Sequence, residues 1–283
     1  MNLANHLDTT DHGPERARSM ATLGDALSNV AEYAEAEHQY RQALKICEAQ
    51  CGSDCNVLVS VLNSLATLLT DCNELEEAQQ YYERSIAAQR RSVGPDPVLM
   101  ATTLGYLANV ARLRLDYARA EILYKQALTI ARQTCGSNHI ETAKGLNNLA
   151  ILLSAKGDDV VAEALFRRAL TVFDKVCGVE SYGSQCVHMN MARTFINLGD
   201  YKQAEKFARK VLKWREESLA ENHPDLGYVK QLLGDVYSAM QDFERAETMY
   251  QMAFLELSDA LGIDHPASHY ALSRLNELIA QSE

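Results

Sequence analysis

The chain has 283 residues, 47% of them hydrophobic, and a formal net charge of −11 from 27 basic and 38 acidic side chains. This acidic balance argues against nucleic acid or an anionic membrane as the main partner, while a local basic groove stays compatible with it. No apolar run approaches the ~20 residues that span a bilayer, and the first residues lack the apolar segment of a signal peptide. We therefore expect a cytoplasmic protein without membrane insertion.

Taken in order, residues 1–13 fit no pattern and are predicted to be an N-terminal tail. From there on, two small residues recur every 42 positions without insertion or deletion. One series is alanine throughout: Ala36, Ala78, Ala120, Ala162, Ala204 and Ala246. The other is Gly52, Gly94, Gly136, Gly178 and Gly262, with Ala220 as the exception. This period predicts one elongated solenoid with repeats at about 14–52, 53–94, 95–136, 137–178, 179–220 and 221–262 and a capping helix at 263–283.

Each repeat is predicted to hold two antiparallel helices, and no strand pattern competes. In the third repeat, an apolar stripe at helical spacing runs through Leu104, Leu107 and Ala111. The first helices have N-cap acceptors at Asp54, Asp96, Asn138, Asn222 and Asp264, and the second helices at Asp116, Asp158, Asp200 and Asp242. Gly157 and Gly199 are expected to end first helices. The predicted fold class is all-α.

Small and large residues are placed where the helices of a repeat would meet. Close backbone approach is expected at Gly24, Ala66, Ala108, Ala150, Ala192 and Gly234. Large residues are expected to fill the gap at Leu23, Leu65, Leu107, Leu149, Met191 and Leu233, and at Tyr40, Tyr82, Tyr124, Phe166 and Tyr250. This combination resembles the tetratricopeptide repeat (TPR). The 42-residue period and the phrase GSNHIETAKGLNNLAILL, from Gly136 to Leu153, resemble the long-helix variant of kinesin light chains.

The resemblance covers about residues 14 to 283 and implies a right-handed α-α superhelix of six helix pairs plus the C-terminal capping helix. Its first helices would line a concave groove that binds an extended peptide or partner segment, as in an adaptor or scaffold. In kinesin light chains the asparagines of the NNLA motif contact cargo peptides, which points to Asn147 and Asn148 here. An alternative function is a ligand-sensing regulatory module of a larger signalling system, or one partnered with an effector enzyme.

Register within the repeat defines a predicted peptide-binding groove. Its residues are Asn63, Ser64, Thr67, Tyr106, Asn109, Arg112, Lys144, Asn147, Asn148, Asn190 and Arg193. Asparagine carries both a donor and an acceptor, which suits it to the backbone of an extended peptide. The three cations in the set would favour an acidic protein or peptide partner. The alternative is that these asparagines are only solvated residues on a helix face.

Repeat five differs most from the others and carries a second candidate surface. His188 stands where leucine is usual, which allows either tolerated variation or a local bend or docking notch near this repeat. A possible convex basic patch follows helical spacing through Lys202, Lys206, Arg209, Lys210 and Lys213. The alternative for this patch is a charged, solvated helix face. Trp214 shares its register with Ile130 and Val172, so we expect it in the core.

No catalytic motif is found, and we expect no enzyme activity, no cofactor and no metal site. His139, His223 and His265 share one repeat position at a helix start and are interpreted as turn residues. Cys47, Cys51 and Cys55 are spaced four apart, which leaves a metal or redox site as an alternative. However, the position of Cys51, Cys135 and Cys177 holds Val93, Leu219 or Leu261 in other repeats, which favours buried packing.

Overall fold

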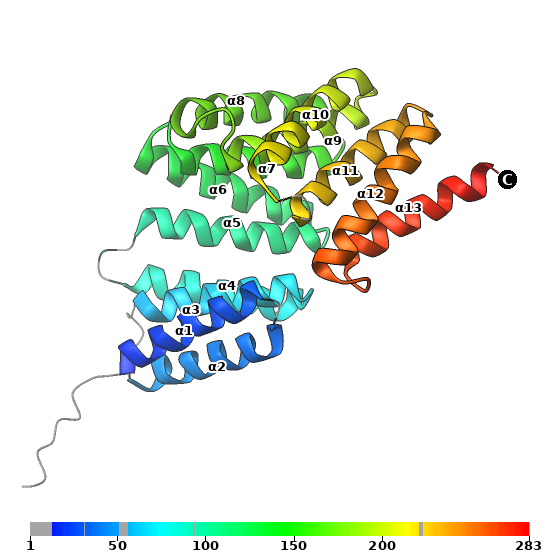
Figure 1. Ribbon diagram of the computed structural model, residues 1–283. Coiled ribbons are helices and arrows are strands. Elements are labelled where there is room, and N and C mark those ends of the chain that lie inside the picture. The colour runs from blue at the N-terminus through cyan, green and yellow to red at the C-terminus, as the bar shows by residue number, and fades with distance from the viewer. Residues whose placement is uncertain are drawn as a thin grey trace, which may run out of the picture. The chain divides into compact units, whose positions relative to one another are not determined.

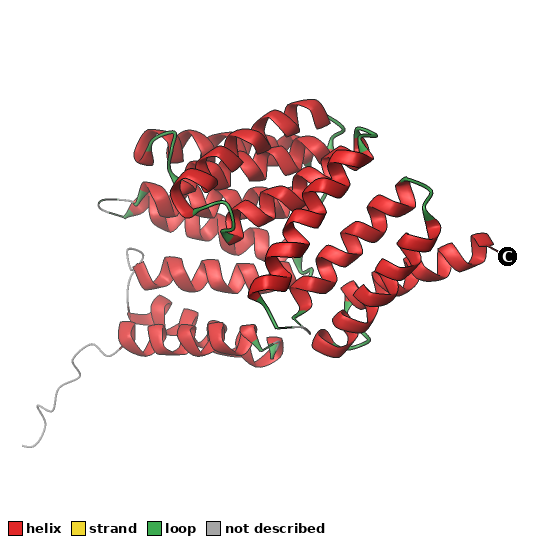
Figure 2. Ribbon diagram, turned by 45° about the horizontal axis from the view of Figure 1, so that its top comes forward, coloured by secondary structure: helices red, strands yellow, loops and turns green. Residues whose placement is uncertain are grey.

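The computed structural model describes residues 13–30, 32–50, 56–92, 94, 96–220 and 223–282. Within these ranges the chain forms thirteen helices and no strand (Figures 1 and 2), which confirms the all-α class. The helices are α1 (Gly13–Asn29), α2 (Tyr33–Gln50), α3 (Asn56–Asp71), α4 (Leu75–Arg91), α5 (Pro97–Leu113), α6 (Tyr117–Cys135), α7 (Ile140–Ala155), α8 (Asp159–Cys177), α9 (Tyr182–Asn197), α10 (Tyr201–Ser218), α11 (Pro224–Ala239), α12 (Phe243–Leu261) and α13 (Pro266–Ser282).

The helices belong to two compact bodies. The N-terminal body spans residues 1–136 and holds α1 to α6, and the C-terminal body spans residues 137–283 and holds α7 to α13. In each body the first helices of neighbouring repeats contact one another, as α1 and α3 do and as α7 and α9 do. We call the surface formed by the odd-numbered helices of a body its first-helix face, and that of the even-numbered helices its second-helix face. The single continuous solenoid stays a prediction.

The N-caps are only partly those expected from the sequence. Asp96 caps α5, accepting hydrogen bonds from the backbone N–H groups of Val98 and Leu99. At α7, α11 and α13, however, a histidine one position later than the expected asparagine or aspartate is the acceptor. The imidazole Nδ1 atoms of His139, His223 and His265 each accept the backbone N–H two residues further on, at 3.2 Å. The prediction of Asn138 and Asp264 as caps was therefore wrong, while Asp54 and Asn222 lie outside the described residues.

The second helices are capped mostly as expected. Asp116, Asp200 and Asp242 each accept a backbone N–H of the first turn, whereas Asp158 makes no such bond. The preceding turn uses the left-handed backbone conformation. Gly157 and Gly199 adopt it with φ of 87° and 74°, as glycine does at little cost.

The core follows the repeat register, with two exceptions. Trp214 is buried as expected, and the series from Leu65 to Leu233 is buried as well. Leu23, by contrast, is 48% exposed. It lies in the first helix pair, where no earlier described pair covers it. Cys177 is exposed and Cys135 half-buried, so the expected buried packing at this position was wrong for Cys177.

His188 fits into the core of repeat five through aromatic and polar contacts. Its ring lies edge-on to Trp214 at 5.1 Å and 5.3 Å from the ring of Phe207. The Nδ1 atom lies 2.8 Å from the carbonyl oxygen of Ser184, which can only accept, so Nδ1 carries the hydrogen. The Nε2 atom is then the acceptor that faces the ammonium group of Lys210 at 3.3 Å. The folded state therefore holds a neutral imidazole.

We expect His188→Leu to reduce the loss of stability on acidification. Burial, and next the charge of Lys210, lower the pKa of His188 below its usual 6.5, against the raising effect of the Ser184 carbonyl and of Asp174. Because the folded pKa lies below the unfolded one, the stabilising contribution is present above about pH 6.5 and is lost as pH falls below it. Urea unfolding followed by Trp214 fluorescence at about pH 7.5 and about pH 5.5 measures this difference. Equal losses in both proteins would contradict the expectation.

Candidate functional site

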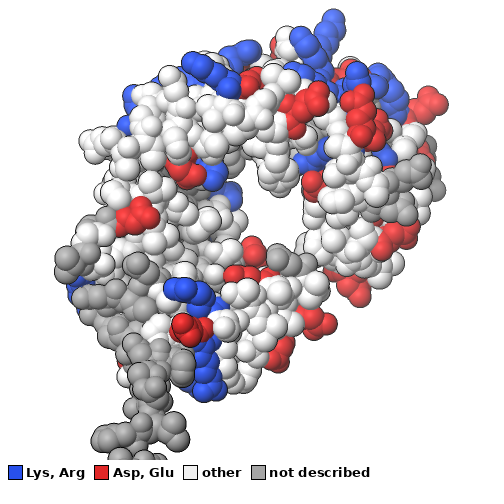
Figure 3. All heavy atoms as spheres, turned by 60° about the vertical axis from the view of Figure 1, so that its left-hand side comes forward, with Lys and Arg blue, Asp and Glu red and all other residues white. Residues whose placement is uncertain are grey.

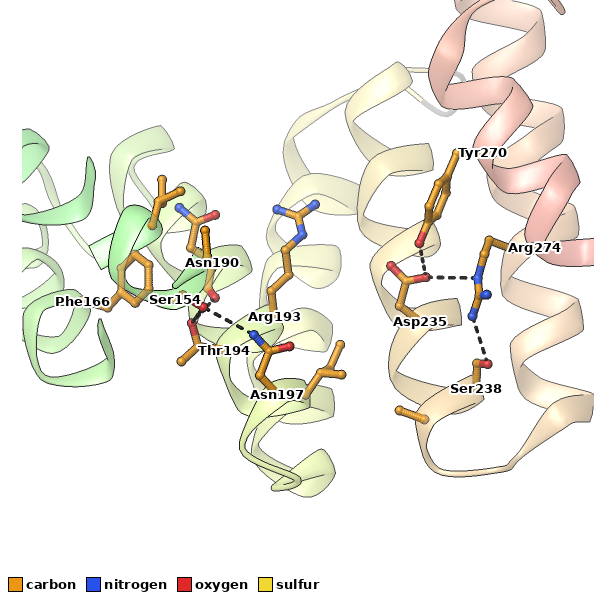
Figure 4. Close-up of a pocket in the computed structure, with 14 residues that line it drawn as sticks. Ser154, Phe166, Asn190, Arg193, Thr194, Asn197, Asp235, Ser238, Tyr270 and Arg274 are labelled. Atoms are coloured by element: carbon orange, nitrogen blue, oxygen red, sulfur yellow. Dashed lines mark hydrogen bonds and ion pairs between the residues drawn. The ribbon is translucent and has the colours of Figure 1, made fainter. Parts of the chain in front are cut away.

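A pocket of about 610 Å³ opens on the first-helix face of the C-terminal body (Figure 4). It is lined by residues of α7, α9, α11 and α13 and by Phe166 of α8. The polar lining residues are Ser154, Asn190, Arg193, Thr194, Asn197, Asp235, Ser238, Tyr270 and Arg274. The pocket therefore combines amides, hydroxyls and charges of both signs on the face where the sequence predicts peptide binding.

One wall of this pocket comes from a single stripe of α9. Asn190, Arg193, Thr194 and Asn197 follow the spacing of three and four residues that places side chains on one helix face. Arg193 is exposed and makes no hydrogen bond or ion pair with any residue that the structure describes. In Figure 4 its guanidinium group extends from α9 between the two walls, without a bonded partner. This wall thus offers a cation that makes no hydrogen bond or ion pair with a described residue, although its charge acts on Asp235 and Tyr270 across the pocket.

The opposite wall is a closed polar network around Asp235. The Oδ1 atom of Asp235 accepts hydrogen bonds from the hydroxyl groups of Tyr250, at 2.7 Å, and Tyr270, at 2.9 Å. The Nε atom of Arg274 lies 4.0 Å from the same oxygen, and its Nη2 atom donates to Ser238 at 3.3 Å. Figure 4 shows the links of Asp235 to Tyr270 and Arg274 and of Arg274 to Ser238, which join α11 and α13.

The Asp235 carboxylate is stabilised from several sides. Burial raises the pKa of Asp235, while the hydrogen bonds from Tyr250 and Tyr270 and the charges of Arg274 and Arg193 act in the opposite direction. Burial, followed by the Asp235 charge, raises the pKa of Tyr270 to about 12, so its hydroxyl stays a donor at neutral pH. The Nη1 atom of Arg274 is held at 2.5 Å by Glu277. Arg193 is therefore the cation of this pocket that is available to an anionic ligand.

The predicted asparagines beside the pocket form a chain of hydrogen bonds. The Nδ2 atom of Asn190 donates to Oδ1 of Asn147 at 3.1 Å, and Nδ2 of Asn147 donates to Oδ1 of Asn148 at 3.3 Å. No described donor occupies the Oδ1 atom of Asn190 at one end of the chain. This oxygen and that of Asn197, whose Nδ2 donates to Asp159 at 3.1 Å, are placed to accept a partner's N–H groups.

The other predicted cations are engaged by local partners. Lys144 lies 2.8 Å from a carboxylate oxygen of Glu141, one turn earlier on α7. The Nη2 atom of Arg112 donates to Oδ1 of Asn109 at 2.8 Å, so these two predicted residues are bonded to each other. Neither cation lines the pocket around Arg193.

Four predicted residues line a separate pocket of about 540 Å³ on the first-helix face of the N-terminal body: Asn63, Ser64, Thr67 and Tyr106. Asn63 differs from an exposed groove residue, since it is 8% exposed and its Nδ2 atom donates to the hydroxyl of Thr103 at 3.0 Å. Thr67 lies 2.8 Å from the hydroxyl of Tyr82. Tyr106 is 44% exposed.

The predicted basic patch lies on α10, on the second-helix face of the C-terminal body. Arg209 is held at 2.8 Å by Glu205, and Lys213 lies 3.8 Å from Glu217. The Lys210 ammonium group lies 4.6 Å from the centre of the Trp214 ring. Lys202 and Lys206 make no ion pair with a described residue. On the face shown in Figure 3, basic and acidic side chains lie next to one another in several places, and large areas carry neither.

The sequence analysis missed the wall around Asp235, Tyr270 and Arg274. The signal was present, because Tyr270 and Arg274 occupy the same repeat positions as Lys144 and Asn148. Extending the register into the last half-repeat would have placed both on the first-helix face. The described residues contain no cluster of three or more His, Cys, Asp or Glu arranged to hold a metal ion. Across the described helices, none has the length and apolar character that crossing a membrane requires.

Comparison with known proteins identifies the repeat. One family model described as "Tetratricopeptide repeat" matches residues 57–133, 99–175 and 184–254, and a second with the same description matches residues 16–54. No curated protein matches.

Solved structures share the fold at low sequence identity. BtubC (BKLC) from P. vanneervenii has a TM-score of 0.62 and 22% identity, covering 92% of this chain and 95% of that one. A putative kinesin light chain of Podosopora anserina has a TM-score of 0.61 and 19% identity, covering 74% and 98%. The apo form of RapI has a TM-score of 0.63 and 13% identity, covering 94% and 98%.

Proposed function

Since the chain belongs to the tetratricopeptide repeat family, whose members are generally scaffolds for protein interaction, we propose that it binds an extended segment of a protein partner at the Arg193 pocket. An acidic side chain of that segment is bound by Arg193. The observation that carries this proposal is the guanidinium group of Arg193, which makes no hydrogen bond or ion pair with a described residue, whereas Arg274, the other cation of the pocket, is bonded to Glu277.

The amides beside Arg193 suit the backbone of such a segment. The free carbonyl oxygens of Asn190 and Asn197 lie on the same stripe of α9, on either side of Arg193. Each accepts a backbone N–H irrespective of the partner's side chain, whereas a guanidinium group discriminates in favour of a carboxylate. The site therefore fixes an extended backbone and adds one charge-specific contact.

Arg193→Glu is expected to weaken partner binding by at least about tenfold, because a charge-assisted hydrogen bond is replaced by repulsion. The matched control is Arg168→Glu, which places the same change on an exposed arginine of α8. Wild-type protein captures the partner from lysate, mass spectrometry identifies it, and its affinity for all three purified proteins is then measured. Equal affinity for wild type and Arg193→Glu would contradict the proposal.

A second variant tests the amide chain. Asn147→Ala combined with Asn148→Ala removes the side-chain oxygen that accepts a hydrogen bond from Asn190. We expect this double variant to bind the same partner severalfold more weakly, with unchanged helicity. Asn63→Ala is excluded from this set because its buried side chain makes a loss of stability the expected result.

A further inference from the structure

Another pocket, of about 490 Å³, lies within the N-terminal body where repeats two and three meet, between α4, α5 and α6. Its exposed lining residues all belong to the second helices α4 and α6, so it opens on the second-helix face. These residues are Arg90, Lys125, Gln126 and Thr129. We call this pocket the Arg90 groove. Its volume lies within the range of about 300–1,000 Å³ that is usual for binding sites.

The remaining lining of the Arg90 groove is apolar. Leu104 is 4% exposed, and Met100 and Ile130 are half-buried and pack against the core of the N-terminal body. The side chain of methionine is flexible and polarizable, so it adapts to apolar groups of different shape. The groove therefore offers a surface on which an apolar side chain can pack.

The charged residues of this lining are both basic, although the chain as a whole is acidic. No aspartate or glutamate is among the described residues that line the groove. The Nζ atom of Lys125 lies 2.6 Å from a carboxylate oxygen of Glu121, one turn earlier on α6. Arg90 is exposed and makes no hydrogen bond or ion pair with a described residue. Its guanidinium group is thus available to a carboxylate, which it can bind through two parallel hydrogen bonds.

The preceding repeat junction shows how the same position is closed elsewhere in the chain. Between repeats one and two, Arg84 of α4 forms an ion pair with Glu48 of α2. One repeat later, these two positions hold Gln126 and Arg90. Gln126 makes no hydrogen bond with any residue that the structure describes. The ion pair that spans the first junction therefore has no counterpart across the Arg90 groove.

The apolar lining also differs from its equivalents in later repeats. In the C-terminal body, the positions of Leu104 and Ile130 hold side chains that contact each other: His188 with Trp214, and Lys230 with Glu256. Leucine and isoleucine are smaller than the first pair and cannot form the ion pair of the second. The Arg90 groove therefore combines an accessible apolar surface with a cation that has no partner among the described residues.

We propose that the Arg90 groove binds a large apolar side chain of a partner protein that has a carboxylate beside it. The apolar side chain packs on Met100, Leu104 and Ile130, and the carboxylate bonds to Arg90. An apolar anchor in a pocket with a matching charge at its edge is a common way for few residues to dominate an interface. The groove is independent of the Arg193 pocket, since it lies in the other body and on the second-helix face. Failure of one proposal therefore leaves the other standing.

The test uses the full chain with isotope-labelled methionine methyl groups, so that NMR titration follows Met100 directly. Loss of one signal in Met100→Leu assigns it. The probes are three acetylated and amidated tripeptides: Glu-Leu-Glu, Gln-Leu-Gln, which lacks the charge, and Glu-Ala-Glu, which lacks the large apolar side chain. We expect a saturable shift with Glu-Leu-Glu and at least about tenfold weaker binding of the other two. Saturation by octanoate without saturation by Glu-Leu-Glu would assign the groove to a small apolar acid and overturn the proposal.

Variants of the groove connect the shift to its residues. Arg90→Gln should weaken Glu-Leu-Glu by at least about tenfold. Arg91→Gln removes the same charge from an exposed neighbour that does not line the groove and should leave binding unchanged. Arg90→Glu combined with Gln126→Arg has the same net charge as Arg90→Gln but restores the ion pair of the preceding junction, and it should abolish the saturable shift.

Three results overturn the proposal. The first is that Glu-Leu-Glu gives no saturable shift at Met100. The second is that Gln-Leu-Gln or Glu-Ala-Glu binds as tightly as Glu-Leu-Glu. The third is that Arg90→Gln, or the double variant, binds like wild type while its circular dichroism spectrum is native.

Discussion

Glu256→Ala is expected to lower the free energy of unfolding of the C-terminal body by about 3–5 kcal/mol. Glu256 forms an ion pair with Lys230 inside repeat six, where the two side chains are 15% and 8% exposed. Removing the carboxylate leaves a buried ammonium group without its counter-ion, which is the costly outcome for such pairs. Trp214 is the single tryptophan and lies in this body, so its fluorescence during urea unfolding reports the loss.

Replacing both partners by apolar residues should reverse this loss. Repeat four has Leu146 and Val172 at the positions of Lys230 and Glu256. The double variant Lys230→Leu/Glu256→Val is therefore expected to lie within about 1 kcal/mol of wild type or above it, because desolvation of the charges offsets their attraction. A double variant as unstable as Glu256→Ala would contradict this account of the pair.

An exposed ion pair provides the control for this comparison. Arg167 and Glu163 are separated by one turn on α8, with side chains 57% and 26% exposed. Glu163→Ala should cost about 0.3–0.5 kcal/mol, as is typical of such pairs.

Gly234→Ala is expected to destabilise the same body by about 1–3 kcal/mol, although most repeats have alanine at this position. A Cβ atom on Gly234 would lie 2.6 Å from Cε1 of Tyr250. The ring cannot retreat freely, because it is fully buried and its hydroxyl is bonded to Asp235 at 2.7 Å. Urea unfolding followed by circular dichroism measures the change.

Repeat one has the same combination of a glycine, a tyrosine ring close to it and an aspartate that bonds the tyrosine hydroxyl. A Cβ atom on Gly24 would lie 2.7 Å from Cε1 of Tyr40, whose hydroxyl donates to Asp25. The repeats with alanine here have Thr67, Asn109, Ile151 and Arg193 in place of the aspartate. We infer that the hydrogen bond to the aspartate holds the tyrosine ring against the first helix, and that glycine is needed there because a Cβ atom would overlap the ring. Tyr250→Phe removes this bond and should reduce the cost of Gly234→Ala, which a double-mutant cycle measures.

Gly105→Ala is the matched control and should have the opposite sign. Gly105 lies within α5, and nothing lies within 4 Å of the position of its Cβ atom. Alanine there should stabilise the protein by about 0.5–1 kcal/mol through helix propensity alone. A stabilising Gly234→Ala would show that the Tyr250 ring moves aside and would contradict the packing account.

The helices could be predicted from the repeat because cap and turn residues close in the sequence determine each helix boundary. Asp96 and Pro97 start α5, and Gly157 marks a turn that needs positive φ. The His139 cap was missed because asparagine ranks above histidine as an N-cap, while the structure begins α7 one residue later. Register alone could not reveal this shift.

The sequence predicted where the residues of the candidate site lie, but not which of their side chains are buried or already bonded within the protein. The repeat register placed Asn63 on the groove side. In the structure its amide instead donates a hydrogen bond to Thr103, forty residues later, and the side chain is buried. The partners of Lys144 and Arg112 lie three residues away on their own helices, so spacing could have indicated them. The network around Asp235 joins three helices, and no local sequence pattern predicts such a contact.

The central claim is that the first-helix face of the C-terminal body binds an extended segment with an acidic residue at Arg193. The most direct measurement is selection of a displayed library of random twelve-residue peptides against wild type, Arg193→Glu and Arg168→Glu. The account predicts that wild type and Arg168→Glu enrich the same peptides, with Asp or Glu at one fixed position, and that Arg193→Glu loses them. Enrichment of one peptide set by all three proteins, or of peptides without an acidic position, would contradict it.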